Sequence, residues 1–176
     1  MRGFFQTLAL VLFSANVCAS DFGTTGIVDT PTARMQPDAT FTSSLAYDTR
    51  TQSYALTYQA FPWLETTFRY TGFEDFFLWD RNYEAKVRLW EEAGWLPQVS
   101  VGMRDMLGTG VFSSEYVVAS KQLGNLDLTA GMGWGRLAGD GVIKNPMRFV
   151  SDRFNSRDNE VGKGGTFSTG SFFSGD

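Results

Sequence analysis

The chain has 176 residues, with 15 basic and 19 acidic side chains, a net charge of −4 and no histidine. The mildly acidic balance, without a basic run, argues against nucleic acid as a partner, because that binding depends on clustered Lys and Arg. The lack of histidine excludes Ser–His and Cys–His catalytic pairs and His metal sites. The length predicts one domain, and 15% aromatic residues with 19 glycines suit aromatic anchors and tight turns rather than a large interior core.

The start of the chain has the features of a cleaved secretory signal. Arg2 supplies a small positive region, residues 4–13 form a short apolar run, and small residues precede Ser20. The run is too short to span a bilayer as a helix. It also has almost none of the polar positions that a buried core helix, the alternative interpretation, would need. We therefore predict that residues 1–19 are a signal peptide.

Cys18 is the single cysteine of the chain. A lipoprotein signal would place its lipid-modified cysteine here, although Val17 is a poor match to the small residue expected before it. Lipid attachment at Cys18 is therefore the alternative to its removal with the signal. If Cys18 is removed, the mature chain has no thiol, which excludes disulfides and Cys-based metal sites.

Seven segments alternate between apolar and polar residues with a period of two, which is the period of a β-strand. The clearest is residues 83–89, in which Tyr, Ala, Val and Leu alternate with Glu, Lys and Arg. Such alternation predicts a sheet with one apolar and one polar face. The seven segments are approximately residues 40–48, 52–60, 64–72, 83–89, 96–104, 114–121 and 126–135.

The connections between these segments alternate in length. Those at residues 60–63, 91–94 and 123–125 are tight, whereas those at 73–80 and 105–112 are longer. With a periplasmic N-terminus, every tight turn falls on the periplasmic side, and the short turn near residue 49 is an external exception. We predict an all-β fold, an antiparallel up-and-down meander of about seven strands that is part of an outer-membrane β-barrel.

The five tryptophans lie at the ends of these segments. Trp63, Trp90 and Trp95 fall at the periplasmic ends, and Trp79 and Trp134 toward the outer ends. Amphipathic aromatic side chains collect at membrane interfaces, so this placement favours the membrane topology. The alternative is a secreted β-sandwich whose tryptophans seal the ends of its core.

The strands account for residues 40–135, and the flanking parts differ from them. We predict an N-terminal periplasmic segment over residues 20–39 and a Gly/Ser-rich loop or disordered tail over residues 136–176. Seven strands would leave unpaired edges, which lipid does not tolerate. Either more strands lie downstream in a longer parent protein or several copies pair, and we favour a truncated barrel.

Several stretches, in order over about residues 23–135, resemble the YjbH-type family of outer-membrane exopolysaccharide proteins. They are residues 26–35, 61–65, 86–92, 95–99, 102–105, 108–110, 114–121 and 131–135. The resemblance implies a β-barrel in the outer membrane that acts with periplasmic partners in producing or exporting extracellular polysaccharide. It also implies a parent several times longer than this chain, and it supplies no catalytic residues.

Charged side chains on the polar faces of the strands are the candidate site residues. In a barrel they would face the lumen, where they could bind a passing glycan or pair with one another across adjacent strands. Arg34, before the first strand, could belong to a docking element or plug, or to a simple turn. The candidates are Glu65, Arg69, Glu84, Lys86, Arg88, Arg104 and Asp127.

Other motifs carry little chemistry. Glu91 and Glu92 are neighbours in a turn, and Glu74 and Asp75 lie in an aromatic loop, so both pairs favour solvated turns over a glycosidase carboxylate pair. The glycines near residues 108–110 and 162–165 lack the Lys-Ser/Thr and helix of a phosphate loop. We therefore predict no catalytic residue, no cofactor and no metal.

Taken as a whole, the sequence favours a non-enzymatic outer-membrane barrel component involved in exopolysaccharide production or export. The expected partners are outer-membrane lipid, periplasmic proteins of the exopolysaccharide system and the polysaccharide itself. The alternatives are a soluble secreted carbohydrate-binding β-sandwich and an outer-membrane enzyme that acts on lipid or glycan.

Overall fold

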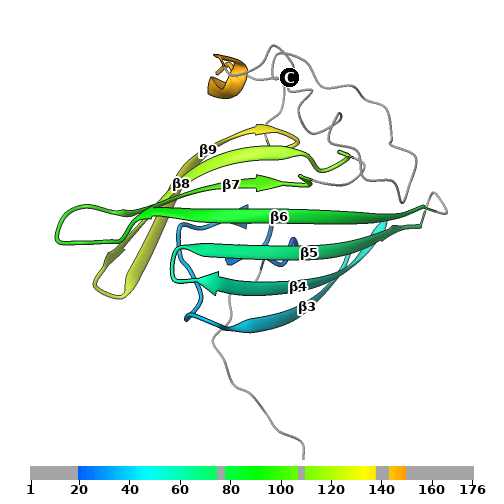
Figure 1. Cartoon of the computed structure of the whole chain (residues 1–176), viewed down its shortest axis with the longest axis horizontal. Coiled ribbons are helices and arrows are strands. Elements are labelled where there is room, and N and C mark those ends of the chain that lie inside the picture. The colour runs from blue at the N-terminus through cyan, green and yellow to red at the C-terminus, as the bar shows by residue number, and fades with distance from the viewer. Residues whose placement is uncertain (1–19, 75–77, 107–109, 138–142, 150–176) are drawn as a thin grey trace, which may run out of the picture.

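The protein is all-β in a computed structural model that describes residues 20–74, 78–106, 110–137 and 143–149. One antiparallel sheet has seven strands, and each pairs with the next along the chain. The strands are β3 (Phe41–Tyr47), β4 (Thr51–Phe61), β5 (Leu64–Phe73), β6 (Leu78–Trp90), β7 (Gln98–Arg104), β8 (Ser114–Leu123) and β9 (Leu126–Gly135). The sheet curls into a half-barrel (Figure 1). The predicted all-β meander is confirmed.

Two shorter features flank this sheet. Before it, β1 (Gly26–Ile27) and β2 (Thr30–Pro31) form a small antiparallel hairpin. After it, a single 3-10 turn covers Pro146–Phe149. No helix among the described residues is long and apolar enough to cross a bilayer. The predicted signal peptide and most of the predicted tail lie outside the described residues.

Strand register sorts the side chains onto two faces. Glu65 pairs with Lys86, Lys86 with Gly102 and Gly102 with Tyr116, so these residues share the concave side, here called the inner face. The residues that alternate with them form the outer face. Inner-face side chains are mostly buried and outer-face side chains are mostly exposed or half-exposed. The polar residues therefore occupy the interior of the half-barrel.

Most strand ends lie within two residues of those predicted, and the connection before β7 and the start of β6 are the informative differences. β6 begins at Leu78, five residues before the predicted segment. β7 begins only at Gln98, because residues 91–97 form a longer connection in which Ala93 and Leu96 make an isolated bridge. Gly94 lies inside that bridge with φ of 55°, a left-handed conformation that glycine adopts without a Cβ clash. The turn predicted at residues 91–94 therefore lies slightly later in the chain, within the bridge between Ala93 and Leu96.

Candidate functional site

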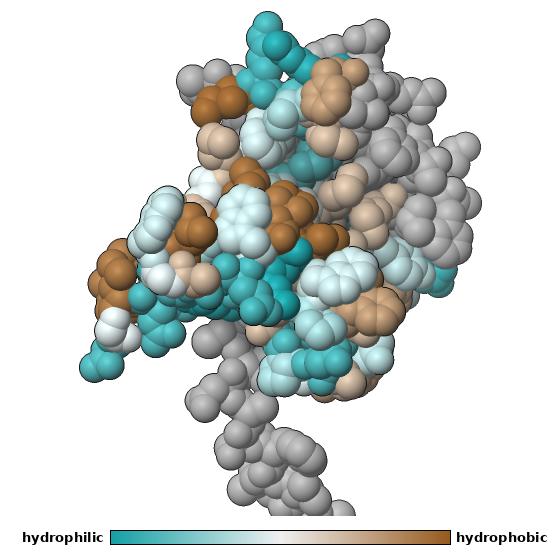
Figure 2. Space-filling view, turned by 60° about the vertical axis from the view of Figure 1, so that its left-hand side comes forward, coloured by the Kyte–Doolittle hydropathy of each residue, from teal (hydrophilic) through white to brown (hydrophobic). Residues whose placement is uncertain are grey.

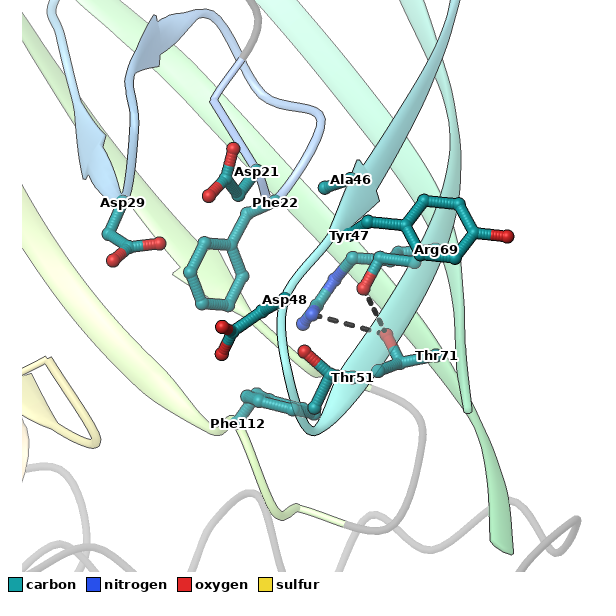
Figure 3. Close-up of a pocket in the computed structure, with 11 residues that line it drawn as sticks. Asp21, Phe22, Asp29, Ala46, Tyr47, Asp48, Thr51, Arg69, Thr71 and Phe112 are labelled. Carbon is teal, nitrogen blue, oxygen red and sulfur yellow. Dashed lines mark hydrogen bonds between the residues drawn. The ribbon is translucent and has the colours of Figure 1, made fainter. Parts of the chain in front are cut away.

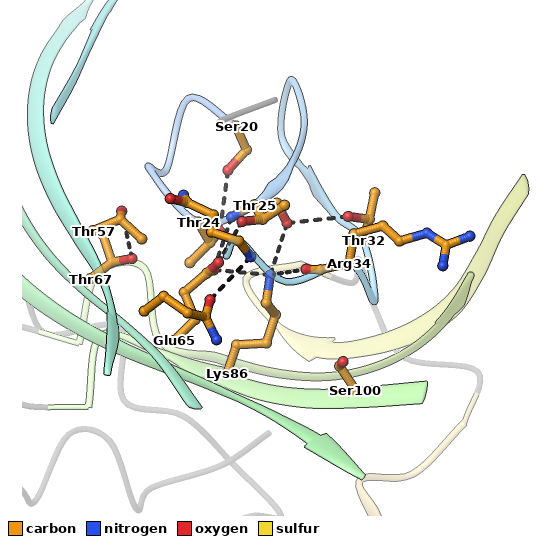
Figure 4. Close-up of polar contacts among 12 residues, drawn as sticks. Ser20, Thr24, Thr25, Thr32, Arg34, Thr57, Glu65, Thr67, Lys86 and Ser100 are labelled. Atoms are coloured by element: carbon orange, nitrogen blue, oxygen red, sulfur yellow. Dashed lines mark hydrogen bonds and ion pairs between the residues drawn. The ribbon is translucent and has the colours of Figure 1, made fainter. Parts of the chain in front are cut away.

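The N-terminal segment, residues 20–39, lies against the inner face and is held there mainly through its own backbone (Figure 4). The hydroxyl of Thr57 on β4 donates to the carbonyl of Gly23 at 2.7 Å. On the far side, the amide of Gln98 and the hydroxyl of Ser100, both on β7, donate to the carbonyl of Ala33 at 2.6 and 2.8 Å. The segment therefore bridges strands on opposite sides of the half-barrel.

A buried ion pair lies at the centre of this contact. Lys86 and Glu65 are fully buried, and Lys86 Nζ is 2.9 Å from Glu65 Oε1. The ammonium group also donates to the carbonyls of Thr25 at 3.1 Å and Arg34 at 2.9 Å. The Glu65 carboxylate accepts from both the backbone N–H and the hydroxyl of Thr25. Because a lysine has three N–H donors, Lys86 is fully satisfied within the half-barrel.

A second buried cluster surrounds the ring of Phe22. The guanidinium groups of Arg69 and Arg104 lie over this ring, 4.3 and 4.0 Å from its centroid, within the range of cation–π attraction. Arg69 also lies 4.4 Å from the ring centroid of Phe112. The carboxylate of Glu84 is 3.6 Å from Arg69 and 3.7 Å from Arg104. The ring of Phe22 thus contacts two arginines that share one carboxylate.

A third cluster lies at the rim, where side chains are partly exposed. Arg34 donates to both carboxylate oxygens of Asp127 at 2.9 and 2.7 Å, and it lies 2.8 Å from Glu92. Lys121 approaches the same Glu92 at 2.6 Å. Hydrogen bonds from Lys121 and Arg34 lower the pKa of Glu92 to about 2, and the hydrogen bond to Asp127 raises the pKa of Arg34. Both shifts favour the charged forms of Glu92 and Arg34, the pair at the centre of the rim cluster.

Strand register places all seven candidate residues on the inner face, but they do not form one site. Five belong to the two buried clusters, and Asp127 belongs to the rim cluster. Arg88 pairs instead with Glu91 at 2.5 Å, near the end of β6. Among the described residues, no three Cys, Asp or Glu side chains come together to hold a metal ion. That these residues line a lumen and meet a glycan stays a prediction.

Sequence reasoning missed the partners of these charges. Phe22 and Thr25 come from a segment without strand periodicity, and nothing in their spacing marks them as contacts of Arg69 or Glu65. Glu91 and Glu92, weighed above as a carboxylate pair, instead pair with different cations. Glu74 is exposed, and Asp75 lies outside the described residues. The one available signal was Arg34, whose contacts with Glu92 and Asp127 lie within this chain, and whether it belongs to a docking element or plug stays a prediction.

The outer face has the opposite character. Leu45 is 69% exposed, Leu56 43% and Leu128 48%. Toward the end of the half-barrel where β6 leads into β7, apolar side chains also lie at the surface, beside a hydrophilic area (Figure 2). Trp79 stacks on Tyr70, with ring centroids 4.7 Å apart, near one end of the strands. At the opposite end, further exposed aromatic side chains occupy the turns and strand ends. They are Phe61, Trp63, Trp90 and Trp95.

These features define a class of protein: an antiparallel half-barrel with a charged inner face, an apolar outer face and an N-terminal segment docked inside. The chain belongs to the YjbH family, described as exopolysaccharide biosynthesis protein YbjH, whose model matches residues 18–176. The resemblance drawn from the sequence is thereby confirmed, and the family is one of exopolysaccharide biosynthesis.

A similar curated protein is the "Uncharacterized lipoprotein YjbH" of Escherichia coli (strain K12). The two are 42% identical over 168 residues, which cover 89% of this chain and 24% of the relative. The chain thus spans about a quarter of the length of that relative. No solved structure matches the chain.

Proposed function

We propose that this chain forms part of the wall of an outer-membrane β-barrel that acts, without catalysis, in the production or export of exopolysaccharide. The observation that carries the proposal is the reversed polarity of the two faces. Glu65 and Lys86 are fully buried on the inner face, whereas Leu45 is 69% exposed on the outer face. A protein folded in water normally has the opposite arrangement.

The energetics favour lipid as the environment of the outer face. Monomeric proteins in water rarely expose a contiguous apolar patch larger than a few hundred Å², which corresponds to only a few side chains. Here exposed Leu, Tyr, Phe and Met residues extend over β3, β4 and β9. In a bilayer the same surface faces hydrocarbon, and alternation of apolar-out and polar-in residues is the pattern of transmembrane barrels.

The aromatic side chains support the same orientation. Trp79 stacks on Tyr70 and, at 6.2 Å between ring centroids, on Tyr54. Trp63 stacks on Phe61, at 5.4 Å, at the other end of β4. Aromatic residues at both ends of the strands match the two interfaces of a bilayer. We propose that the turn between β4 and β5 is periplasmic and the turn between β3 and β4 is external.

The proposal includes further strands. Within the described residues, β3 and β9 each have a sheet neighbour on one side only, and unpaired backbone groups are too costly in hydrocarbon. The E. coli relative is about four times as long as the stretch that matches it, so a longer parent could supply the missing strands. That relative is also named a lipoprotein. This name favours lipid attachment at Cys18 over removal of Cys18 with the signal.

Fractionation tests the proposal directly. Cells that produce the protein are separated into periplasm and membranes, and the membranes are washed with urea. We expect the protein to stay with the outer membrane and to leave it only in detergent. Recovery in the periplasm without detergent would overturn the barrel and favour the secreted β-sandwich. Mass spectrometry of the mature N-terminus then distinguishes an acylated Cys18 from a free Ser20.

The absence of catalysis is tested separately. We expect Glu74→Ala, Glu91→Ala and Glu92→Ala to retain polysaccharide output, because each carboxylate is solvated or bound in an ion pair. Glu92→Gln serves as a second variant at the rim, since it removes the charge but retains the side-chain volume. Loss of output with normal membrane assembly in any of these variants would favour an enzyme.

A further inference from the structure

A cavity of about 390 Å³ opens between the N-terminal segment and the end of the sheet where β3 turns into β4 (Figure 3). Its volume is in the range of small-molecule pockets. Under the proposed topology, this is the external end of the half-barrel. The cavity therefore lies where an exported glycan would leave the protein.

The wall of the cavity formed by the sheet is polar and pre-organised. Arg69 is 2% exposed, and its guanidinium lies against the rings of both Phe22 and Phe112, which contact each other edge to face. Its Nη1 donates to the hydroxyl of Thr71 at 3.3 Å, and that hydroxyl is 3.1 Å from the hydroxyl of Ser53. These groups keep fixed positions before any ligand arrives, which lowers the entropy cost of binding.

Three carboxylates complete the lining. Asp21 and Asp29 come from the N-terminal segment and Asp48 from the turn after β3, and all three are exposed and lie around Phe22 in Figure 3. Within the described part of the chain, no hydrogen bond or ion pair engages the carboxylates of Asp21 and Asp29. The charge of Arg69 is already shared with Glu84. The cavity therefore has an excess of negative charge and free acceptors.

We propose that this cavity is a saccharide-binding subsite for sugar units that carry hydroxyl or amino groups and no acidic group. Sugar hydroxyls and amines donate to the free carboxylates of Asp21 and Asp29, and a sugar hydroxyl accepts from the hydroxyl of Thr51 on β4. A uronic acid would instead be repelled by three carboxylates. The subsite rests on the proposed function, since it takes the polysaccharide to be the cargo of the half-barrel.

Binding is measured by NMR titration of the protein in lipid nanodiscs, because a glycoside detergent would itself present a sugar. The probes are glucosamine oligosaccharides, glucose oligosaccharides and oligogalacturonate. We expect the first two to bind and the third not to bind. Asp21→Asn and Asp29→Asn should each weaken binding of the glucosamine probe about tenfold, as expected for loss of a charged hydrogen-bond acceptor.

Asp38→Asn is the matched control, because it removes an exposed carboxylate from the same segment outside the cavity. We expect this variant to have the same affinity for each probe as the unsubstituted protein. The subsite is overturned if no probe binds, if oligogalacturonate binds as tightly as the others, or if the Asp21 and Asp29 variants bind unchanged. Membrane fractionation of the same preparations tests the proposed function separately. If no probe binds but the protein remains in the membrane, the subsite is wrong and the proposed function still holds.

Discussion

A lysine in the interior of a protein is stable only when its charge and its donors are satisfied, and Lys86 meets both conditions through Glu65, Thr25 and Arg34. Lys86→Met would leave the Glu65 carboxylate buried without a cation. Breaking one side of a buried ion pair costs about 3–5 kcal/mol. We expect a loss of unfolding free energy of that order, measured by urea titration in lipid vesicles.

The double variant Glu65→Gln/Lys86→Met is the control for this prediction. It removes both charges, while the glutamine oxygen can still accept from the backbone N–H of Thr25 and the glutamine NH2 can donate to the hydroxyl of Thr25. We expect the double variant to be more stable than Lys86→Met alone, because no unpaired charge remains. Equal stability of the two variants would contradict the role of the Glu65–Lys86 pair.

Asp105, which follows β7, gives a pH-dependent prediction. Burial and the nearby carboxylate of Asp80 raise the pKa of Asp105 to about 7. Two contacts act in the opposite direction and lower this pKa: the N–H of Phe112, which donates to Asp105 at 3.0 Å, and the charge of Arg69. The carboxylate of Glu84 raises it further. Because the folded state retains a proton that the unfolded state releases at lower pH, stability falls as pH rises from about 4 to about 7 and then levels off.

Asp105→Asn should remove this loss. The residue has φ of 56°, which asparagine tolerates, and its amide oxygen can accept from Phe112. We expect the variant to match the parent at pH 4 and to be more stable by about 1 kcal/mol or more at pH 8, the cost of a buried and imperfectly paired polar group. Urea midpoints at several pH values measure this, and a pH-independent difference would contradict it.

At the scale of elements, alternation predicted most strands and their faces but not the start of β6. Asp80 and Asn82 usually indicate turns, so residues 78–82 do not have the pattern of a strand. Both are fully buried on the inner face, where a polar interior makes such residues ordinary strand positions. The interpretation of Asp80 and Asn82 as turn residues failed because it presumes that the buried face of a sheet is apolar.

The place of the N-terminal segment could not be predicted from periodicity either. It is held by its backbone carbonyls, as Ala33 shows with Gln98 and Ser100. Backbone groups are present at every residue and carry no sequence signal. What the sequence did predict is the polar inner face to which such a segment can bind.

Packing between neighbouring strands gives a prediction for Gly102. It pairs in register with Tyr116, and a Cβ added at Gly102 would lie 2.1 Å from the phenol ring. Tyr116 is 3% exposed, so its ring has little room to move. We expect Gly102→Ala to lower the unfolding free energy by about 1–3 kcal/mol, as overpacking typically does.

A double-mutant cycle separates this clash from other effects of the added methyl group. On a Tyr116→Ala background the space above Gly102 is empty, so Gly102→Ala should cost little there. An equal cost on both backgrounds would show that the ring of Tyr116 is not the cause. Denaturant midpoints of the four proteins supply the measurement.

For the whole molecule, the two faces raise the question of which solvent surrounds the half-barrel. Leu56 lies near the middle of β4 on the outer face and is 43% exposed, and Tyr47 lies at the end of β3 and is 74% exposed. In hydrocarbon an arginine costs about 2–4 kcal/mol at the bilayer midplane and about 0–1 kcal/mol near the interface. In water, substitutions at exposed positions usually change stability by less than about 0.5 kcal/mol.

Leu56→Arg and Tyr47→Arg therefore distinguish a membrane barrel from a secreted sandwich. We expect Leu56→Arg to reduce assembly into the outer membrane and to lower stability in vesicles by about 2–4 kcal/mol, with Tyr47→Arg close to the parent. Tyr47 is the more exposed of the two positions and is expected to tolerate the arginine, whereas Leu56 is expected to reject it. The difference is expected because Leu56 lies deeper in the bilayer than Tyr47. If both variants assembled and unfolded like the parent, the outer face would have to lie in water.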